Sequence, residues 1–96
     1  MNTIAAIATA PGEGAIAIIR ISGKEAFEIG EAIFSRSIKN FATHTAHYGN
    51  ILTSDGEPID SVLLLIMKSP RSYTGEDSIE ISCHGESLVK IGRAHV

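Results

Sequence analysis

The sequence predicts an α+β domain, with a small mixed or antiparallel sheet and one or two packed helices. Three observations support this prediction. Segments with strand character outnumber helical ones, one long segment has helical spacing, and an Asp-Gly pair marks a hairpin between two apolar stretches. With 96 residues and a hydrophobic share of 44%, the chain can bury one small core.

The first predicted strand covers residues 3–9, where isoleucines stand among alanines before a Pro-Gly-Glu-Gly turn at 11–14. Residues 15–22 form the second. Four isoleucines make this stretch almost continuously apolar, which predicts burial on both faces of the sheet. Gly23 ends it.

Residues 24–34 have the spacing of an amphipathic helix, with glutamates on the polar side. Ser22 is expected to cap its first turn, together with Glu25 in a capping box. Gly30 falls on the apolar side, where the missing side chain allows close packing against a sheet. The apolar side is formed by Ala26, Phe27, Ile29, Ile33 and Phe34.

The middle of the chain predicts a hairpin. A loop at 35–46 leads into a strand at 47–52, and residues 54–57 form an Asp-Gly turn. The returning strand, 59–67, contains an aliphatic block that indicates a central position in the sheet. Near the end of the sequence, residues 86–90 begin a helix.

Polar side chains are densest between residues 72 and 85. An acidic loop with a glycine turn precedes a strand that alternates strictly, which places one carboxylate, Glu80, in the middle of a sheet face. Ile79, Ile81 and Cys83 share one face, and Ser78, Glu80 and Ser82 share the other.

Glu80 and Arg20 are the candidate binding residues, and each has two interpretations. Arg20 stands among isoleucines, so it either forms a salt bridge with a nearby carboxylate or recognises a ligand. Glu80 either lies on a solvated sheet face or accepts two parallel N–H donors from a planar heterocycle such as a pterin or a guanine.

The sequence does not match two familiar nucleotide-binding motifs. Gly23-Lys24 is followed by Glu25 and has Ile18 where the Walker pattern needs its first glycine, so no P-loop is present. The glycines at 12 and 14 open an isoleucine-rich strand, whereas a dinucleotide-binding motif would open a helix.

No catalytic residue and no metal ligand set is predicted. His84 has no serine or cysteine nucleophile at a diagnostic spacing, and its role stays open. His44 and His47 are three apart, but in a loop they make only a weak metal site. Cys83 is expected to be a small buried side chain.

Composition excludes several classes of protein. A net charge of −3 with mixed signs argues against a free-standing nucleic-acid binder. A single cysteine cannot form an internal disulfide, which favours a reducing cytoplasm. The first ten residues lack the basic region of a signal peptide, and the longest apolar run, 62–67, is too short to span a bilayer.

The last six residues, Ile-Gly-Arg-Ala-His-Val, are what ATC-GGA-AGA-GCA-CAC-GTC encodes, and this string resembles a common sequencing adapter. Residues 91–96 are therefore expected to be a translated artefact, and residues 1–90 the natural domain, incomplete at its C-terminus. The alternative is an ordinary helix end with Gly92 near its C-cap.

Four stretches resemble the opening domain of the MnmE (TrmE) family of tRNA modification GTPases. They are residues 3–23, 47–49 (His-Tyr-Gly), 72–77 (Ser-Tyr-Thr-Gly-Glu-Asp) and 80–85 (Glu-Ile-Ser-Cys-His-Gly), in the family's order. The resemblance extends over residues 2–90. The chain departs from the family at Ala10 and Glu13, where other members often carry Pro and Arg.

The resemblance implies a fold similar to the folate-binding domain of aminomethyltransferases. It implies that the domain binds a tetrahydrofolate derivative, in the 5-formyl or 5,10-methylene form, and makes a homodimer contact. The family's folate contacts fall on Arg20, in the strand before Ser-Gly, and on Glu80, in the strand after Thr-Gly-Glu-Asp.

For the whole protein, the resemblance implies a cytoplasmic enzyme that hydrolyses GTP with potassium and magnesium. With a flavin-containing partner, MnmG (GidA), such proteins modify carbon 5 of the wobble uridine in certain tRNAs. The P-loop belongs to a later segment of the family, so this chain alone is not expected to hydrolyse GTP.

Two alternatives remain open beside a folate-binding and dimerisation module. An aminomethyltransferase-type folate enzyme would need its own catalytic acid, and no isolated, desolvated aspartate is evident in the sequence. A purely structural dimerisation module would use Arg20 and Glu80 only as an ion pair.

Overall fold

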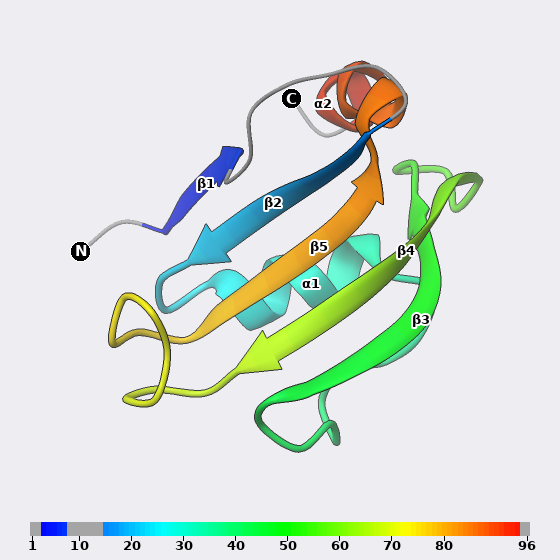
Figure 1. The fold of residues 1–96 in the computed structure, drawn as a ribbon. Coiled ribbons are helices and arrows are strands. Elements are labelled where there is room, and N and C mark those ends of the chain that lie inside the picture. The colour runs from blue at the N-terminus through cyan, green and yellow to red at the C-terminus, as the bar shows by residue number, and fades with distance from the viewer. Residues whose placement is uncertain (1–2, 8–14, 95–96) are drawn as a thin grey trace.

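The computed structural model describes residues 3–7 and 15–94, which form a five-stranded sheet in the order β1-β2-β5-β4-β3 (Figure 1). Every neighbouring pair of strands is antiparallel, and two short helices accompany the sheet, so the expected α+β class is confirmed. The strands are β1 (Ile4–Ile7), β2 (Ile16–Ser22), β3 (Thr45–Leu52), β4 (Pro58–Met67) and β5 (Ser78–His84).

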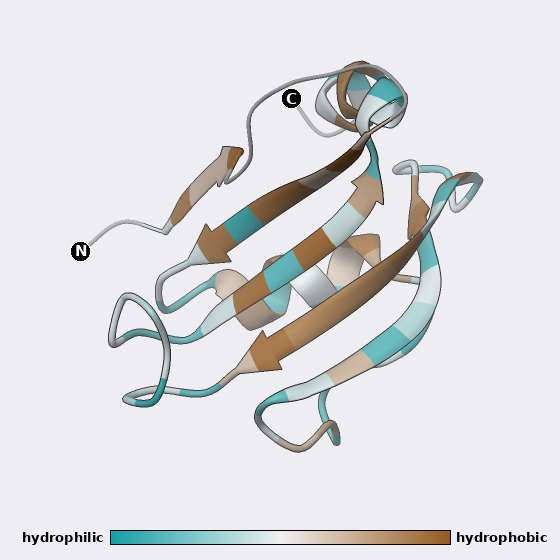
Figure 2. Ribbon diagram, in the orientation of Figure 1, coloured by the Kyte–Doolittle hydropathy of each residue, from teal (hydrophilic) through white to brown (hydrophobic). Residues whose placement is uncertain are grey.

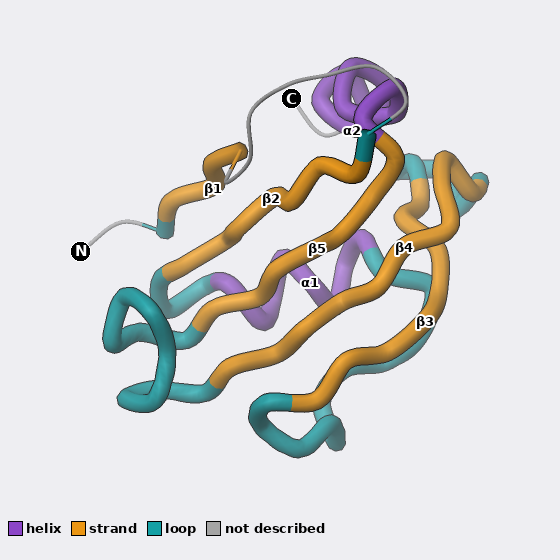
Figure 3. Tube along the Cα trace, in the orientation of Figure 1, coloured by secondary structure: helices purple, strands orange, loops and turns teal. Residues whose placement is uncertain are grey.

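The path of the chain explains why distant segments become neighbours. Helix α1 (Ala26–Ile33) carries the chain behind the sheet from β2 to the far edge strand, β3 (Figure 1). From there β3, β4 and β5 follow one another as a meander, which brings β5 back beside β2. A 3₁₀ turn, η1 (Gly85–Ser87), and helix α2 (Leu88–Ala94) come after β5 (Figure 3).

The sheet has one covered and one uncovered face. Alternate residues of β2, β4 and β5 point toward α1 and form the core, and Figure 2 shows the resulting change of hydropathy along β5. We call the opposite face the open face. Core residues on these strands are Ala17, Ile21, Val62, Leu64, Ile66, Ile79, Ile81 and Cys83, all at most 4% exposed.

The expectation that residues 15–22 are buried on both faces is wrong. Ile16 is 67% exposed on the open face, while Ala17 and Ile21 are buried on the other. Among the described residues, neither helix packs over the open face. A run of isoleucines therefore reflects one packed face and one apolar face that this chain leaves uncovered.

Helix α1 packs closely on the sheet through Gly30. A Cβ atom at this position would lie 2.9 Å from terminal methyl groups of both Ile38 and Ile79. The predicted capping box is wrong, because Ser22 ends β2 and a turn at Gly23, with φ of +133°, precedes the helix. The Glu25 N–H instead donates to the hydroxyl of Thr3, at 2.9 Å.

The other predicted elements are close to those observed. The hairpin turn is confirmed, with the Glu57 carbonyl accepting from the Thr53 N–H at 2.7 Å, and β4 lies inside the sheet between β3 and β5. Strand β3 begins two residues earlier than expected. Helix α2 continues past residue 90, and Ile91 joins the core at 8% exposure. That residues 91–96 are an artefact stays a prediction, and the glycine turn at 11–14 lies outside the described residues.

Candidate ligand-binding site

The two residues singled out from the sequence lie opposite each other on the open face. The antiparallel register of β2 and β5 pairs Arg20 directly with Glu80, although 60 positions separate them in the chain. The Arg20 Nε–H donates to Glu80 Oε2 at 2.7 Å, and Nη2 lies 2.5 Å from the same oxygen. The structure therefore contains the salt bridge that one interpretation of Arg20 predicted, and Glu80 is the carboxylate that forms it.

This ion pair sits in the middle of the sheet between small or apolar neighbours. Ala6 of β1 lies beside Arg20, and Leu65 of β4 lies beside Glu80. The Glu80 side chain is 12% exposed and that of Arg20 is 33% exposed. Few competing water contacts are available there, so a charge-assisted contact is stronger than it would be on an open surface.

Glu80 keeps an acceptor available. Both contacts from Arg20 fall on Oε2, and among residues 3–7 and 15–94 no donor reaches Oε1. A carboxylate oxygen in this position can accept an N–H group from a ligand. One point of the sheet therefore presents a hydrogen-bond acceptor, Glu80 Oε1, next to a positive charge, the partly exposed Arg20 guanidinium.

The loop at residues 72–77 closes one side of this point. The Tyr73 ring lies over the Arg20 guanidinium, with 4.8 Å between the ring centroid and Cζ. The hydroxyl groups of Thr74 and Ser22 are 2.5 Å apart, which ties the loop to the end of β2. Strand and loop thus approach each other around the ion pair.

A cavity of about 300 Å³ opens between β1, β2 and this loop. Its volume is at the lower end of the range for small-molecule sites and suits a bicyclic ring better than a whole drug-sized ligand. Its wall combines apolar side chains with polar ones and a guanidinium, a donor and acceptor set that fits a flat heterocycle with N–H groups. The lining residues are Ile4, Ala6, Ile7, Arg20, Ser22, Thr74 and Glu76.

Ser78 lies at the same end of the open face, opposite Ser22 in the strand register. Its hydroxyl is fully buried, and within the described part of the chain it has no hydrogen-bond partner. Buried hydroxyl groups almost always have a partner in the protein or in ordered water. Ser78 therefore places a buried hydroxyl group at this end of the open face whose hydrogen-bonding capacity the described strands do not use.

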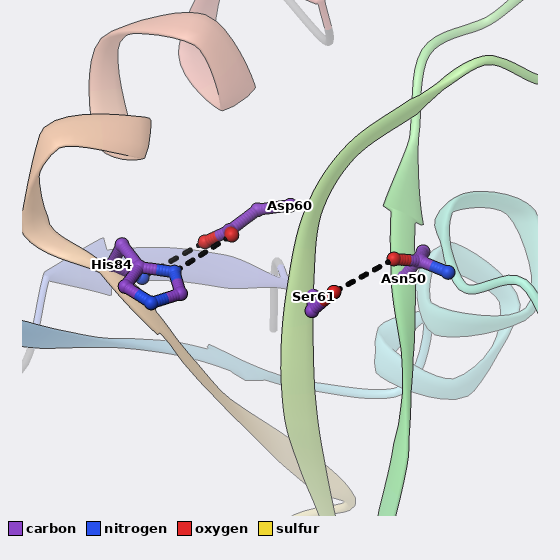
Figure 4. Close-up of polar contacts among 4 residues, drawn as sticks. All are labelled: Asn50, Asp60, Ser61 and His84. Carbon is purple, nitrogen blue, oxygen red and sulfur yellow. Dashed lines mark hydrogen bonds and ion pairs between the residues drawn. The ribbon is translucent and has the colours of Figure 1, made fainter.

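His84 lies away from the ion pair, at the end of β5, where Asp60 of β4 binds it twice (Figure 4). Asp60 Oδ2 accepts the His84 backbone N–H and Oδ1 contacts Nδ1, both at 2.8 Å. Because an ionised carboxylate only accepts, Nδ1 carries the proton. The same view shows the Ser61 hydroxyl donating to Asn50 Oδ1 across β4 and β3, at 3.3 Å.

Asp60 is a residue that the sequence did not single out. Burial acts to raise its pKa, but hydrogen bonds from the backbone and ring of His84 and from Ser87 outweigh this, so the pKa is lowered from 3.8. Tyr73 and Thr74 were part of the polar stretch but had no role of their own. A histidine at a strand end gives no signal of which distant carboxylate it will meet.

The remaining candidate residues from the sequence are Cys83, His44 and His47. Cys83 is 3% exposed, and burial, followed by the charge of Asp60, raises the pKa of its thiol. His44 and His47 belong to no metal site, since no three His, Cys, Asp or Glu side chains gather suitably within residues 3–7 and 15–94. In that same part of the chain, no helix has the length and apolarity to cross a bilayer.

Comparison with known proteins gives a consistent result. A family model described as the GTP-binding protein TrmE N-terminus matches residues 3–92. The tRNA modification GTPase MnmE of Protochlamydia amoebophila is 60% identical over 88 residues, which is 92% of this chain. The proteins of the same name from Chlamydia caviae and Chlamydia abortus are 63% and 60% identical over 84 residues, or 88% of this chain.

The matched region is a small part of these relatives. In each of the three, the alignment covers 19% of the relative's length. The chain therefore spans about one fifth of the proteins that it matches.

Proposed function

We propose that this chain, which belongs to the family of the GTP-binding protein TrmE N-terminus, is a tetrahydrofolate-binding module. Its contacts with the folate include Arg20 and Glu80. The observation that carries the proposal is the position of these two residues. They form a charged pair in which one carboxylate oxygen of Glu80 stays available, and Arg20 of this pair lines the cavity beside it. A structural ion pair alone would not require a cavity or an available carboxylate oxygen next to it.

Each residue has a distinct part in this proposal. Glu80 accepts N–H groups from the amino group and ring of the pterin, beginning with the available Oε1. Arg20 holds the carboxylate in place through Nε and Nη2 and supplies a complementary positive charge. The bound folate, in the 5-formyl or 5,10-methylene form, would supply a one-carbon unit.

Substitution of Glu80 tests the proposal. Hydrogen bonds to charged groups contribute about 1.5–3 kcal/mol each, so Glu80→Ala is expected to abolish binding of 5-formyltetrahydrofolate that calorimetry detects in the unchanged chain. Glu57→Ala, in the exposed hairpin turn, is the matched control and should leave affinity unchanged. Unchanged affinity in Glu80→Ala would reject the role of this residue.

We also propose that the open face makes a homodimer contact. Tyr48 of β3 and Leu63 of β4 are cross-strand partners there, 65% and 49% exposed. A second copy of this chain presents the same apolar surface and can cover it. This occupant is consistent with the family resemblance and with the exposure of these two apolar side chains.

For the longer protein we propose the activity that the names of its relatives state, tRNA modification by a GTPase. In this proposal GTP, potassium and magnesium bind to segments outside this chain. The folate module acts together with a flavin-containing MnmG (GidA) partner on carbon 5 of the wobble uridine in tRNA, in the cytoplasm. Residues 1–90 would be the natural part of the module.

A purely structural dimerisation module is the second candidate, because Arg20 and Glu80 already satisfy each other in this structure. The two candidates differ in a thermal melt. A ligand that binds only the folded state raises the melting temperature. If 5-formyltetrahydrofolate leaves the melting temperature unchanged, the structural module is the better account.

A further inference from the structure

The backbone of the 72–77 loop is tied down at several points. The Ser72 hydroxyl donates to the Glu76 carbonyl at 2.5 Å. Asp77 accepts the Gly23 N–H through its carbonyl and the Ser69 N–H through its side chain, both at 2.9 Å. A loop held by this many contacts keeps a defined position beside the ion pair.

Within this braced loop, the Tyr73 side chain stands out, because it is 74% exposed. Its only described contact is the one with the Arg20 guanidinium below it, at 4.8 Å. One face of the ring therefore rests on Arg20 and the rest is open to solvent. Arginine supports an aromatic ring well in this way, through cation–π and stacking contacts.

The spacing limits where a flat ligand can lie. Stacked carbon atoms prefer about 3.5–4 Å between layers, so a ring inserted between Arg20 and Tyr73 would need roughly 7 Å. The present 4.8 Å leaves no such gap. A planar ligand must therefore pack against the exposed surface of the Tyr73 ring or move that side chain outward. Exposed side chains change rotamer within nanoseconds, whereas the braced backbone need not move.

We infer that Tyr73 is the aromatic wall of the site, the surface against which a flat heterocycle held by Glu80 packs. The inference rests on the proposed folate binding and adds a residue that selects for a planar aromatic ligand. Glu80 then supplies recognition in the plane of the ring, and Tyr73 supplies contact above the plane.

The test uses calorimetry with 5-formyltetrahydrofolate. Loss of base stacking on an aromatic side chain weakens binding by about tenfold or more, so Tyr73→Ala should weaken affinity by that factor. Tyr73→Phe should restore most of it, since the ring is retained. Val89→Ala is the matched control, because Val89 is also an exposed apolar residue, at 62%, but lies on α2, outside the proposed ligand site and the proposed dimer contact.

A second measurement locates the ligand. The chain has two tyrosines, so fluorotyrosine labelling gives two ¹⁹F signals, which Tyr48→Phe assigns. Adding 5-formyltetrahydrofolate should shift the Tyr73 signal and leave that of Tyr48 in place.

The outcomes separate the inference from the proposed function. Binding that depends on Glu80 but is equally tight in Tyr73→Ala, with no shift of the Tyr73 signal, overturns the inference alone. An unchanged chain that does not bind 5-formyltetrahydrofolate overturns the proposed function and the inference with it.

Discussion

Asp60 connects β4 to the end of β5 through a single carboxylate. Its side chain is 10% exposed and accepts two hydrogen bonds from His84, the residue before η1. These bonds favour the ionised form, so the pKa of Asp60 lies below its ordinary value in spite of burial. The carboxylate thus fixes the point at which the chain leaves the sheet and turns into η1 and α2.

The lowered pKa predicts how stability depends on pH. When the folded pKa lies below the unfolded one, the stabilisation is fully present above the unfolded value, here near 3.8, and is lost as pH falls through the folded pKa. Asp60→Asn should therefore lower the free energy of unfolding by about 1–3 kcal/mol at neutral pH. The difference from the unchanged chain should shrink in acid.

Urea denaturation at neutral pH and near pH 3 measures this difference. Asp55→Asn, in the exposed hairpin turn, is the control and should behave as the unchanged chain does. An Asp60→Asn difference that is equally large at both pH values would contradict the role of the ionised carboxylate.

At the scale of elements, the segment after α1 protects the outer edge of β3. Phe34 forms a β-bridge with Ile51, and the Ser35 N–H donates to the Asn50 carbonyl at 2.9 Å. The Arg36 guanidinium donates to the Tyr48 carbonyl at 3.2 Å. Covering an edge strand in this way satisfies its backbone groups and blocks unwanted pairing with another chain.

Gly49 makes this arrangement possible. A Cβ atom there would lie 2.5 Å from Cζ of the Phe34 ring, which is buried at 4% exposure. Because the ring is rigid and enclosed, Gly49→Ala should destabilise the fold by about 1–3 kcal/mol, the usual effect of overpacking. Denaturant unfolding gives this value.

Gly92→Ala is the matched control for Gly49→Ala. No atom lies within 4 Å of the added Cβ at this position in α2, so the substitution should be neutral or slightly stabilising through helix propensity. Equal stability of the Gly49→Ala chain and the unchanged chain would show that the Phe34 ring can shift without penalty.

At the scale of the whole molecule, the two faces of the sheet have different roles. The face toward α1 and α2 holds the core, and the open face holds the charged pair among exposed apolar residues. The open face therefore has two proposed uses, a ligand site on β2 and β5 and a dimer contact on β3 and β4. Both depend on the same sheet remaining uncovered by its own helices.

A charge on the dimer half of the open face tests the second use. Leu63→Lys places an ammonium group within the proposed apolar contact, where its desolvation is unfavourable, and should weaken dimerisation by at least about tenfold. Sedimentation analysis of the chain across a concentration series measures the change.

Val89→Lys is the control, because Val89 is also exposed, at 62%, but lies on α2. It should leave the dimer intact. Equal dissociation of both variants, or of neither, would contradict a contact through β3 and β4.

Alternation along a strand is a local property, and the sequence by itself determined it. The pattern of residues 78–83 placed Glu80 opposite the core before any partner was known, and Cys83 in the core. The Asp-Gly hairpin and the close packing at Gly30 were likewise predictable. Each of these depends on residues that are near one another in the chain.

Only the tertiary structure decided which distant residues meet. The Arg20–Glu80 pair depends on β5 returning beside β2 in one register, and the Asp60–His84 pair depends on the beginning of β4 lying beside the end of β5. The position of Tyr73 over Arg20 depends on both strands and the loop together. Apolar periodicity could not tell a face covered by the chain's own core from one left open, because both kinds of face carry the same apolar residue types.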